Sequence, residues 1–200
     1  METVIILHGL GRSLASMRRM AEYVKEGGFD PVLIDYPSST STIENLTNGL
    51  FDQLPESGII HFVGHSLGGI LSVRIAKMLP VERRGRIVQI GAPNFGSEAA
   101  ERIAVFGKLM GPALAELVPH SGEEVEGLDI GAIAGTAAIP AYGLLTGIEG
   151  ENDGKVSVDS AWGNAAENKR IALPVAHSIM MQDRRVIDAT VNFLKTDKFA

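Results

Sequence analysis

The chain contains no cysteine. This absence excludes disulfide bonds, thiolate metal sites and a cysteine nucleophile. Basic residues are also scarce, because 18 Lys and Arg stand against 24 Asp and Glu, which gives a formal net charge of −6. Nucleic-acid binding relies on clustered Lys and Arg that neutralise phosphates. We therefore expect no nucleic-acid partner.

Long apolar runs are almost absent as well. The stretch 130–148 has nineteen residues without a charge, close to the length that spans a bilayer, but glycines and Pro140 interrupt it. We expect no membrane span there, and instead an Ala/Gly stretch followed by a buried strand at 139–145. The amino terminus lacks the basic segment and small-residue cleavage site of a secretory signal. The sequence thus predicts a cytoplasmic protein, unless a leader was removed.

Short β-branched and apolar runs recur along the chain. They predict strands at 3–7, 31–34, 58–63, 86–90, 139–145 and 169–173. Helical spacing of apolar residues lies between most of these runs, and it is clearest at 14–24, 70–79 and 186–194. Alternation of strand and helix favours a parallel sheet covered on both faces. We expect an α/β fold, a three-layer sandwich with a mainly parallel central sheet of about six strands.

Two hundred residues suit one domain, and no repeat, low-complexity tract or linker divides the chain. We therefore expect a single domain over 1–200. Its least regular region is 94–135, which contains a helix-like segment at 98–117 and an acidic patch at 123–126. Two interpretations stay open for this region: a small lid or cap inserted over the site, and a plain crossover with one extra helix.

The most informative motif is Gly64-His65-Ser66-Leu67-Gly68, where a predicted strand meets a predicted helix. This is the form of a nucleophile elbow, a sharp turn that exposes a serine hydroxyl at the carboxyl edge of a parallel sheet. Glycines are needed at both ends because a side chain there would clash, and the serine is forced toward a positive φ. Ser66 is the candidate nucleophile.

A serine hydroxyl is a weak nucleophile, so it needs a base to take its proton and an acid to orient that base. In this architecture both follow strands, in the chain order serine, acid, histidine. His120 and His177 are the histidines that follow Ser66. No strand precedes His120, whereas His177 comes just after the predicted strand 169–173. His177 is the candidate base, with a helix-capping or surface histidine as the alternative.

The candidate acid is Asp153, in a Gly-Glu-Asn-Asp-Gly segment after the predicted strand 139–145. Asp129 precedes that strand and Asp159 lies further along the chain, so each fits less well. Glu151 and Asp159 remain as alternatives. Asn-Asp-Gly is also typical of a tight turn, and both interpretations can hold together.

Acyl transfer further requires donors for the oxyanion of the tetrahedral intermediate, which backbone amides supply. One donor is the amide after the nucleophile, here Leu67, and the other follows the first core strand, where Leu10 is the candidate. We expect His8 to shape that loop. We also expect a structural role for His65, because adjacent residues on a sharp turn point apart.

Separated motifs in this order resemble the α/β-hydrolase family, specifically its lipase-like serine esterases. They are His8-Gly9-Leu10-Gly11, Gly64-His65-Ser66-Leu67-Gly68-Gly69, Gly91-Ala92-Pro93 with Gly96-Ser97, and Asn152-Asp153-Gly154 before His177. Bacterial lipases similarly carry their acid in an Asn-Asp-Gly turn. The resemblance covers nearly the whole chain, and it implies the same nucleophile, acid, base and oxyanion amides as the reasoning above.

The chain departs from the family pattern in two respects. It opens at the strand that bears His8-Gly9, so we expect the antiparallel strands of the full-size fold to be missing, as in minimal lipases. Some of those lipases bind a structural calcium through an aspartate shortly after the histidine. Here Ser178-Ile179-Met180-Met181 follows His177. We therefore expect no calcium or other metal site.

The expected function is hydrolysis of small acyl esters, which could be lipid-like, through an acyl-serine intermediate and without a cofactor. Apolar residues at 95–117, with Met180 and Met181, hint at an acyl pocket, although such methionines are more often core filler. A thioesterase or acyltransferase could use the same groups. A non-catalytic binding module is the alternative of another class, and a broken triad would have indicated it.

Overall fold

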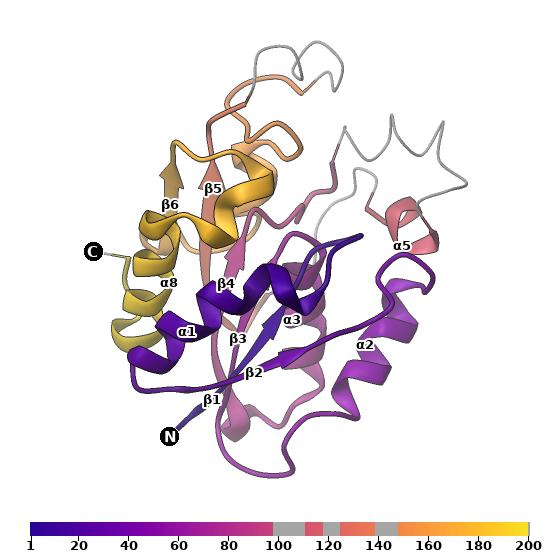
Figure 1. The fold of residues 1–200 in the computed structure, drawn as a ribbon, viewed down its shortest axis with the longest axis vertical. Coiled ribbons are helices and arrows are strands. Elements are labelled where there is room, and N and C mark those ends of the chain that lie inside the picture. Colours follow the sequence, from indigo (N-terminus) through magenta and orange to yellow (C-terminus); the bar gives the residue numbers. More distant parts are fainter. Residues whose placement is uncertain (98–110, 118–124, 139–147, 200) are drawn as a thin grey trace.

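The computed structural model describes residues 1–97, 111–117, 125–138 and 148–199. Within these ranges six strands form one parallel sheet in the order β2-β1-β3-β4-β5-β6 (Figure 1). The strands are β1 Thr3–Leu7, β2 Asp30–Ile34, β3 Ile60–His65, β4 Arg84–Ile90, β5 Asp129–Gly135 and β6 Arg170–Leu173. The predicted central sheet is confirmed.

The strand order places a topological switch point between β1 and β3. The chain passes from β1 outward to β2, crosses back to β3, and then adds β4, β5 and β6 in the opposite direction. Right-handed crossovers that run in opposite directions send their helices to opposite faces of the sheet. The chain after β1 therefore turns toward one face of the sheet and the chain after β3 toward the other, and this switch point is where ligands bind in open α/β sheets.

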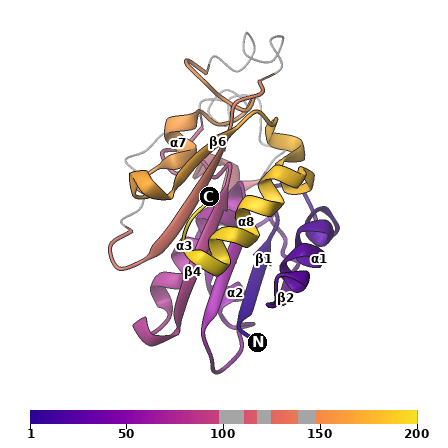
Figure 2. The same cartoon turned by 90° about the vertical axis from the view of Figure 1, so that its left-hand side faces the viewer.

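Helices cover both faces of the sheet. Helices α1 Arg18–Glu26 and α8 Arg184–Thr196 lie on one face, and α2 Ile43–Phe51 and α3 Leu67–Met78 on the other (Figures 1 and 2). Alternate residues of β1 face opposite sides of the sheet. Val4 and Ile6 pack with the α1 and α8 layer, whereas Ile5 and Leu7 pack with the α2 and α3 layer. The remaining helices are short: η1 Leu14–Met17, η2 Val81–Arg83, α5 Pro112–Ala115, α7 Val158–Trp162, η3 Glu167–Lys169 and η4 His177–Gln182.

Helix α2 was not foreseen from the sequence. Thr42 caps its first turn, because the Thr42 hydroxyl accepts a hydrogen bond from the Asn45 amide. Ile43, Leu46 and Leu50 are buried along one side. Three apolar positions in so short a segment gave too weak a periodic signal, although they suffice to attach the helix to the core.

The fifth strand lies earlier in the chain than predicted. The strand predicted at 139–145 lies outside the described residues and stays a prediction. The fifth strand of the sheet is Asp129–Gly135, a segment for which the sequence predicted no strand, and Asp129 is its first residue. The small residues of β5 give no clear strand pattern in the sequence. At Gly131 the absence of a side chain is required, because a Cβ there would lie 2.7 Å from the Phe193 ring of α8. Strand β5 has no side chain at this position, so the large Phe193 ring of α8 can pack directly against its backbone.

This result bears on the two interpretations of 94–135, a lid or cap and a plain crossover with one extra helix. The last residues of that range are β5 and belong to the central sheet. The parts 98–110 and 118–124, with His120, lie outside the described residues, so both interpretations stay open. The uncharged stretch that begins at residue 130 starts inside β5. In the described ranges, no helix is both long and apolar enough to cross a membrane.

Candidate active site

The predicted elbow is present, with Ser66 between β3 and α3. Ser66 has φ 54° and ψ −122°, a conformation that L-residues rarely adopt, so the predicted positive φ is confirmed. The Ser66 amide donates to the Ile90 carbonyl of β4 at 2.9 Å, and the Ser66 carbonyl accepts from the Gly69 amide at 2.8 Å. These hydrogen bonds keep Ser66 in this unfavourable backbone conformation, which costs about 1–3 kcal/mol. The Ser66 side chain is left partly exposed at the carboxyl end of the sheet.

The glycines that flank Ser66 are there because backbone passes too close for a side chain. A Cβ on Gly64 would lie 2.3 Å from the Gly68 carbonyl, and a Cβ on Gly68 would lie 2.5 Å from the Leu7 carbonyl oxygen of β1. Helix α3 therefore begins in direct contact with the end of β1. The motif spacing of the sequence is explained by these two contacts.

Asp153 and His177 form a buried pair. Nδ1 of His177 lies 2.7 Å from Oδ2 of Asp153, and both residues are under 5% exposed. The other carboxylate oxygen, Oδ1, accepts from the Lys155 and Val156 amides, each at 2.9 Å. Because a carboxylate only accepts hydrogen bonds, His177 donates from Nδ1 and its Nε2 is left for other partners.

The pair rests on the ends of two strands where only glycine fits. At the end of β5, a Cβ on Gly135 would lie 2.7 Å from Cβ of Asp153. Just after β4, Gly91 has φ 57°, and a Cβ there would lie 3.1 Å from Oδ2 of Asp153 and 3.2 Å from Nδ1 of His177. Sequence reasoning quoted Gly91 only as part of a motif and missed Gly135. Both could have been found from the sequence as glycines that stand directly at the carboxyl end of a strand.

His65 joins the elbow to the histidine loop. Its Nε2 donates to the His177 carbonyl oxygen at 3.0 Å, and the two imidazole rings lie 4.8 Å apart. Burial, followed by the charge of His177, lowers the pKa of His65 well below its usual range, so its ring stays neutral. This contact is consistent with the structural role expected for His65. In the described part of the chain, no hydrogen bond joins the Ser66 hydroxyl to the His177 ring.

The loop after β1 packs against the elbow. A Cβ on Gly9 would lie 3.2 Å from Cβ of Ser66. His8 shapes this loop, because its Nδ1 lies 2.8 Å from the Gly9 carbonyl oxygen and its ring stacks on Tyr36 at 4.1 Å. The Tyr36 hydroxyl donates to the His8 carbonyl, and burial raises its pKa.

The two candidate oxyanion amides are free of intramolecular acceptors in the described ranges. In the loop after β1, Gly11 donates to the Ser38 hydroxyl and Arg12 to the Gly9 carbonyl, while the Leu10 amide has no such bond. Leu67 is the first residue of α3, where amides have no acceptor within the helix. Both amides belong to segments that contact Ser66.

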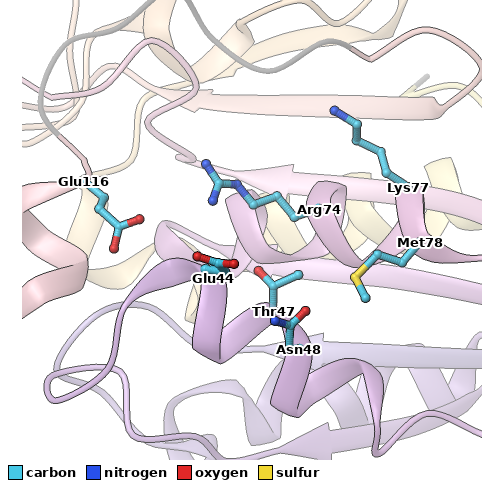
Figure 3. Close-up of a pocket in the computed structure, with 7 residues that line it drawn as sticks. All are labelled: Glu44, Thr47, Asn48, Arg74, Lys77, Met78 and Glu116. Carbon is cyan, nitrogen blue, oxygen red and sulfur yellow. The ribbon is translucent and has the colours of Figure 1, made fainter.

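Two cavities differ in what they could do chemically. One of about 340 Å³ adjoins the buried pair and is lined by residues 153–155 and 176–179. The other, of about 390 Å³, is lined by α2 and α3 with Glu116, and its α3 residues come from the half of the helix remote from Ser66 (Figure 3). Its lining has neither serine nor histidine. No cluster of histidine and carboxylate side chains in the described ranges could hold a metal ion.

The alternative acids do not contact His177. Glu151 and Asp159 are both exposed, and Asp159 lies in the first turn of α7. Asp129 pairs with Lys169 at 2.7 Å, at the amino-terminal end of β5. Of the acids considered from the sequence, the structure therefore brings Asp153 to the histidine.

No known protein-family profile matches the sequence, and no curated protein sequence resembles it significantly. Similar solved structures do exist. The mature lipase BlEst2 from Bacillus licheniformis superposes with a TM-score of 0.75 at 19% identity, over 96% of this chain and 89% of that one. A metagenomic carboxyl esterase gives 0.64 at 19% identity, over 88% and 64%. An extracellular α/β-hydrolase from a Paenibacillus species gives 0.61 at 13% identity, over 96% and 98%.

These likenesses agree with the parallel six-stranded sheet described above. At such low identities they establish architecture and leave the reaction to be argued from the site. This chain has the α/β-hydrolase fold.

Proposed function

We propose that the protein is a serine hydrolase that cleaves carboxylic esters through an acyl-serine intermediate. The observation that carries this proposal is the buried hydrogen bond between Asp153 and Nδ1 of His177, next to a serine held at positive φ. A buried carboxylate that fixes one imidazole nitrogen leaves the other free to exchange protons. Ser66, on the adjoining turn, is the group that such a base would activate.

In the proposed reaction the Ser66 oxygen attacks the ester carbonyl carbon while Nε2 of His177 takes the hydroxyl proton. The imidazolium that forms is stabilised by Asp153, which keeps its negative charge. The hydrogen bond from serine to histidine forms on substrate binding, since such bonds are often loose in unliganded enzymes.

The carbonyl oxygen gains negative charge as the tetrahedral intermediate forms, and the amides of Leu10 and Leu67 donate to it. Backbone amides suit this role because they need no reorganisation at the moment of reaction. The intermediate collapses as His177 returns the proton to the leaving alcohol oxygen. Water then attacks the acyl-serine by the same route, with His177 again as base, and releases the acid.

The names of the similar structures favour ester cleavage among the chemistries that this set of groups could perform, since they include a lipase and a carboxyl esterase. The cavity of about 340 Å³ beside His177 falls within the size range of small-molecule sites. We infer a small acyl ester as substrate. No step of this mechanism needs a metal or a cofactor.

The test is a panel of p-nitrophenyl esters from acetate to palmitate, hydrolysed by the wild type and by Ser66→Ala. The wild type should turn over at least one ester, and Ser66→Ala should be slower by orders of magnitude. Ser57→Ala, which removes an exposed serine ahead of β3, is the matched control and should keep full activity. Equal, slow hydrolysis by the wild type and Ser66→Ala would refute the esterase proposal.

A fluorophosphonate probe identifies the nucleophile independently of the substrate. It should label the wild type and Ser57→Ala but not Ser66→Ala. Labelling that survives Ser66→Ala would show that another serine reacts. Acyl-thioesters in the same panel would reveal a thioesterase as a higher kcat/KM for the thioester than for the matching oxygen ester.

A further inference from the structure

Two basic side chains meet at the cavity beside His177, and the proposed mechanism uses neither of them. Lys155 lines this cavity together with Ser178 and the exposed Ile179. Arg12 reaches the same rim from the loop after β1, where its Nη2 donates to the Ser178 carbonyl oxygen at 3.0 Å. Segments far apart in the sequence thus bring two cations to one side of the candidate base.

Neither cation has a carboxylate partner within the residues that the structure describes. Across the described ranges, Arg12 and Lys155 take part in no ion pair, in contrast to Lys169 and Arg184, whose partners lie at 2.7 Å. Asp153 is the carboxylate of the cavity wall, but it is engaged by His177 and by two backbone amides. Although the chain has a net charge of −6, no carboxylate of the described ranges pairs with these two cations at the candidate active site.

The two charges also act on each other and on the elbow. Desolvation, followed by the charge of Arg12, lowers the pKa of Lys155, whereas Asp153 acts in the opposite direction. After burial and His177, Arg12 and Lys155 contribute to the lowered pKa of His65. An anion in the cavity would relieve this mutual repulsion and be attracted by both cations.

The position of the cavity identifies the part of the substrate that would carry the anion. In the proposed reaction His177 returns its proton to the leaving alcohol oxygen, so the alcohol part must lie on the histidine side. The cavity is on that side, because Ala176, His177 and Ser178 form one of its walls. Exposed Ile179 offers an apolar surface for the carbon skeleton between ester and anion.

We propose that Arg12 and Lys155 are specificity-determining residues that select esters whose alcohol part carries an anionic group, a carboxylate or a phosphate. This inference rests on the proposed ester hydrolase function and adds its substrate class. The guanidinium and ammonium groups bind the anion and orient the scissile carbonyl toward Ser66. They take no part in the chemical step.

The test compares two butyrate esters with nearly isosteric leaving groups, those of 3-hydroxybenzoic acid and 3-hydroxybenzamide. The readout is the ratio of their kcat/KM values, acid over amide. We expect a ratio of about 5 or more in the wild type, falling about threefold to fivefold in Arg12→Gln and in Lys155→Gln, as for exposed charge pairs. Arg18→Gln, an exposed cation of α1, has the same charge change and should keep the wild-type ratio.

A charge-retaining variant and the salt concentration test whether charge is the cause of the preference. Lys155→Arg should restore the ratio, and added NaCl should reduce it in the wild type because surface charge interactions are screened. The butyrate of 3-hydroxyphenylphosphonic acid distinguishes a phosphate-like group, through a higher ratio than the carboxylate gives. The Lys155 side chain makes no hydrogen bond within the described residues, so we expect Lys155→Gln to fold. This variant tests the proposed selectivity even if Arg12→Gln fails to fold.

The outcomes separate this inference from the function on which it rests. If neither ester is hydrolysed in a Ser66-dependent manner, the proposed function is wrong and the substrate class falls with it. If both are hydrolysed through Ser66 without a preference for the acid, the inference alone is overturned. It is equally overturned if the preference survives both glutamine variants, or if Arg18→Gln reduces it as much as they do.

Discussion

The contact between the elbow and β1 predicts a large loss of stability for Gly68→Ala. The added Cβ would lie 2.5 Å from the Leu7 carbonyl oxygen and 2.6 Å from that of His8. Carbon and carbonyl oxygen normally meet at about 3.3 Å, so the first contact is short by about 0.8 Å. Both oxygens belong to the backbone at the end of a central strand, so neither can rotate away as a side chain would.

The cost should fall at the upper end of overpacking substitutions, about 3 kcal/mol. For a chain of this length that corresponds to a fall in Tm of about 6–12 °C. Thermal unfolding followed by circular dichroism measures it, and urea unfolding gives the free energy directly. Turnover should fall too, because relief of the clash moves the Leu67 amide.

Gly49→Ala is the matched control. Gly49 is exposed within α2, and a Cβ there would meet no atom within 4 Å. Because alanine favours a helix interior over glycine, this variant should gain up to about 1 kcal/mol. The same chemical change thus has opposite signs at the two positions. Gly68→Ala with wild-type stability would refute the close contact of α3 with β1.

Three further outcomes are expected. Asp153→Asn should lower kcat about 10⁴-fold by favouring the wrong histidine tautomer, while Tm changes little; near-normal turnover would remove Asp153 from the mechanism. Asp183→Ala removes the N-cap of α8 and should cost about 1 kcal/mol at pH 7. The hydrogen bond from Arg185 lowers the pKa of Asp183, so the stabilisation is present above the unfolded pKa and is lost as pH falls through the lower folded value. Urea midpoints of both proteins should therefore converge as pH falls below the ordinary pKa of aspartate, and a constant difference would contradict this. Burial lowers the pKa of His61 and His65, so the unfolded state binds more protons below about pH 6.5. The free energy of unfolding should fall as pH drops from 6.5 to 5, by at most about 1.4 kcal/mol per unit for each histidine, whereas a flat urea profile would count against neutral buried rings.

The strands that the sequence reveals are those with bulky residues. Residues of β1 and β3 are buried on both faces, and their β-branched and aromatic runs are visible without any structure. Strand β5 is buried just as deeply, but four of its seven residues are Gly or Ala, and at Gly131 the ring of Phe193 fills the space beside it. A hydrophobic periodicity is calculated from the side chains of one segment. It cannot show that a side chain from another segment, here Phe193, fills the space beside a glycine.

The same reasoning explains which parts of the candidate site were predictable. Ser66 is marked by its neighbours in sequence, and His177 by the strand before it. Asp153 was placed by chain order and by a strand expected at 139–145, whereas the described strand before it is β5. Lys155 and Arg12 carry no local signal, because their relevance depends on a cavity and on a contact between Arg12 and Ser178. Contacts between distant loops become visible only once the fold has brought them together.

The fit of Phe193 against Gly131 has a consequence for how this protein can vary over evolution. The Phe193 ring occupies the space that a Cβ on Gly131 would need. A smaller residue at 193 would therefore leave a cavity, and a larger residue at 131 would clash with the ring. A smaller residue on the helix would open a cavity that alanine or valine on the strand could fill. Relatives should therefore exchange the two positions as a linked pair, with the total volume kept roughly constant.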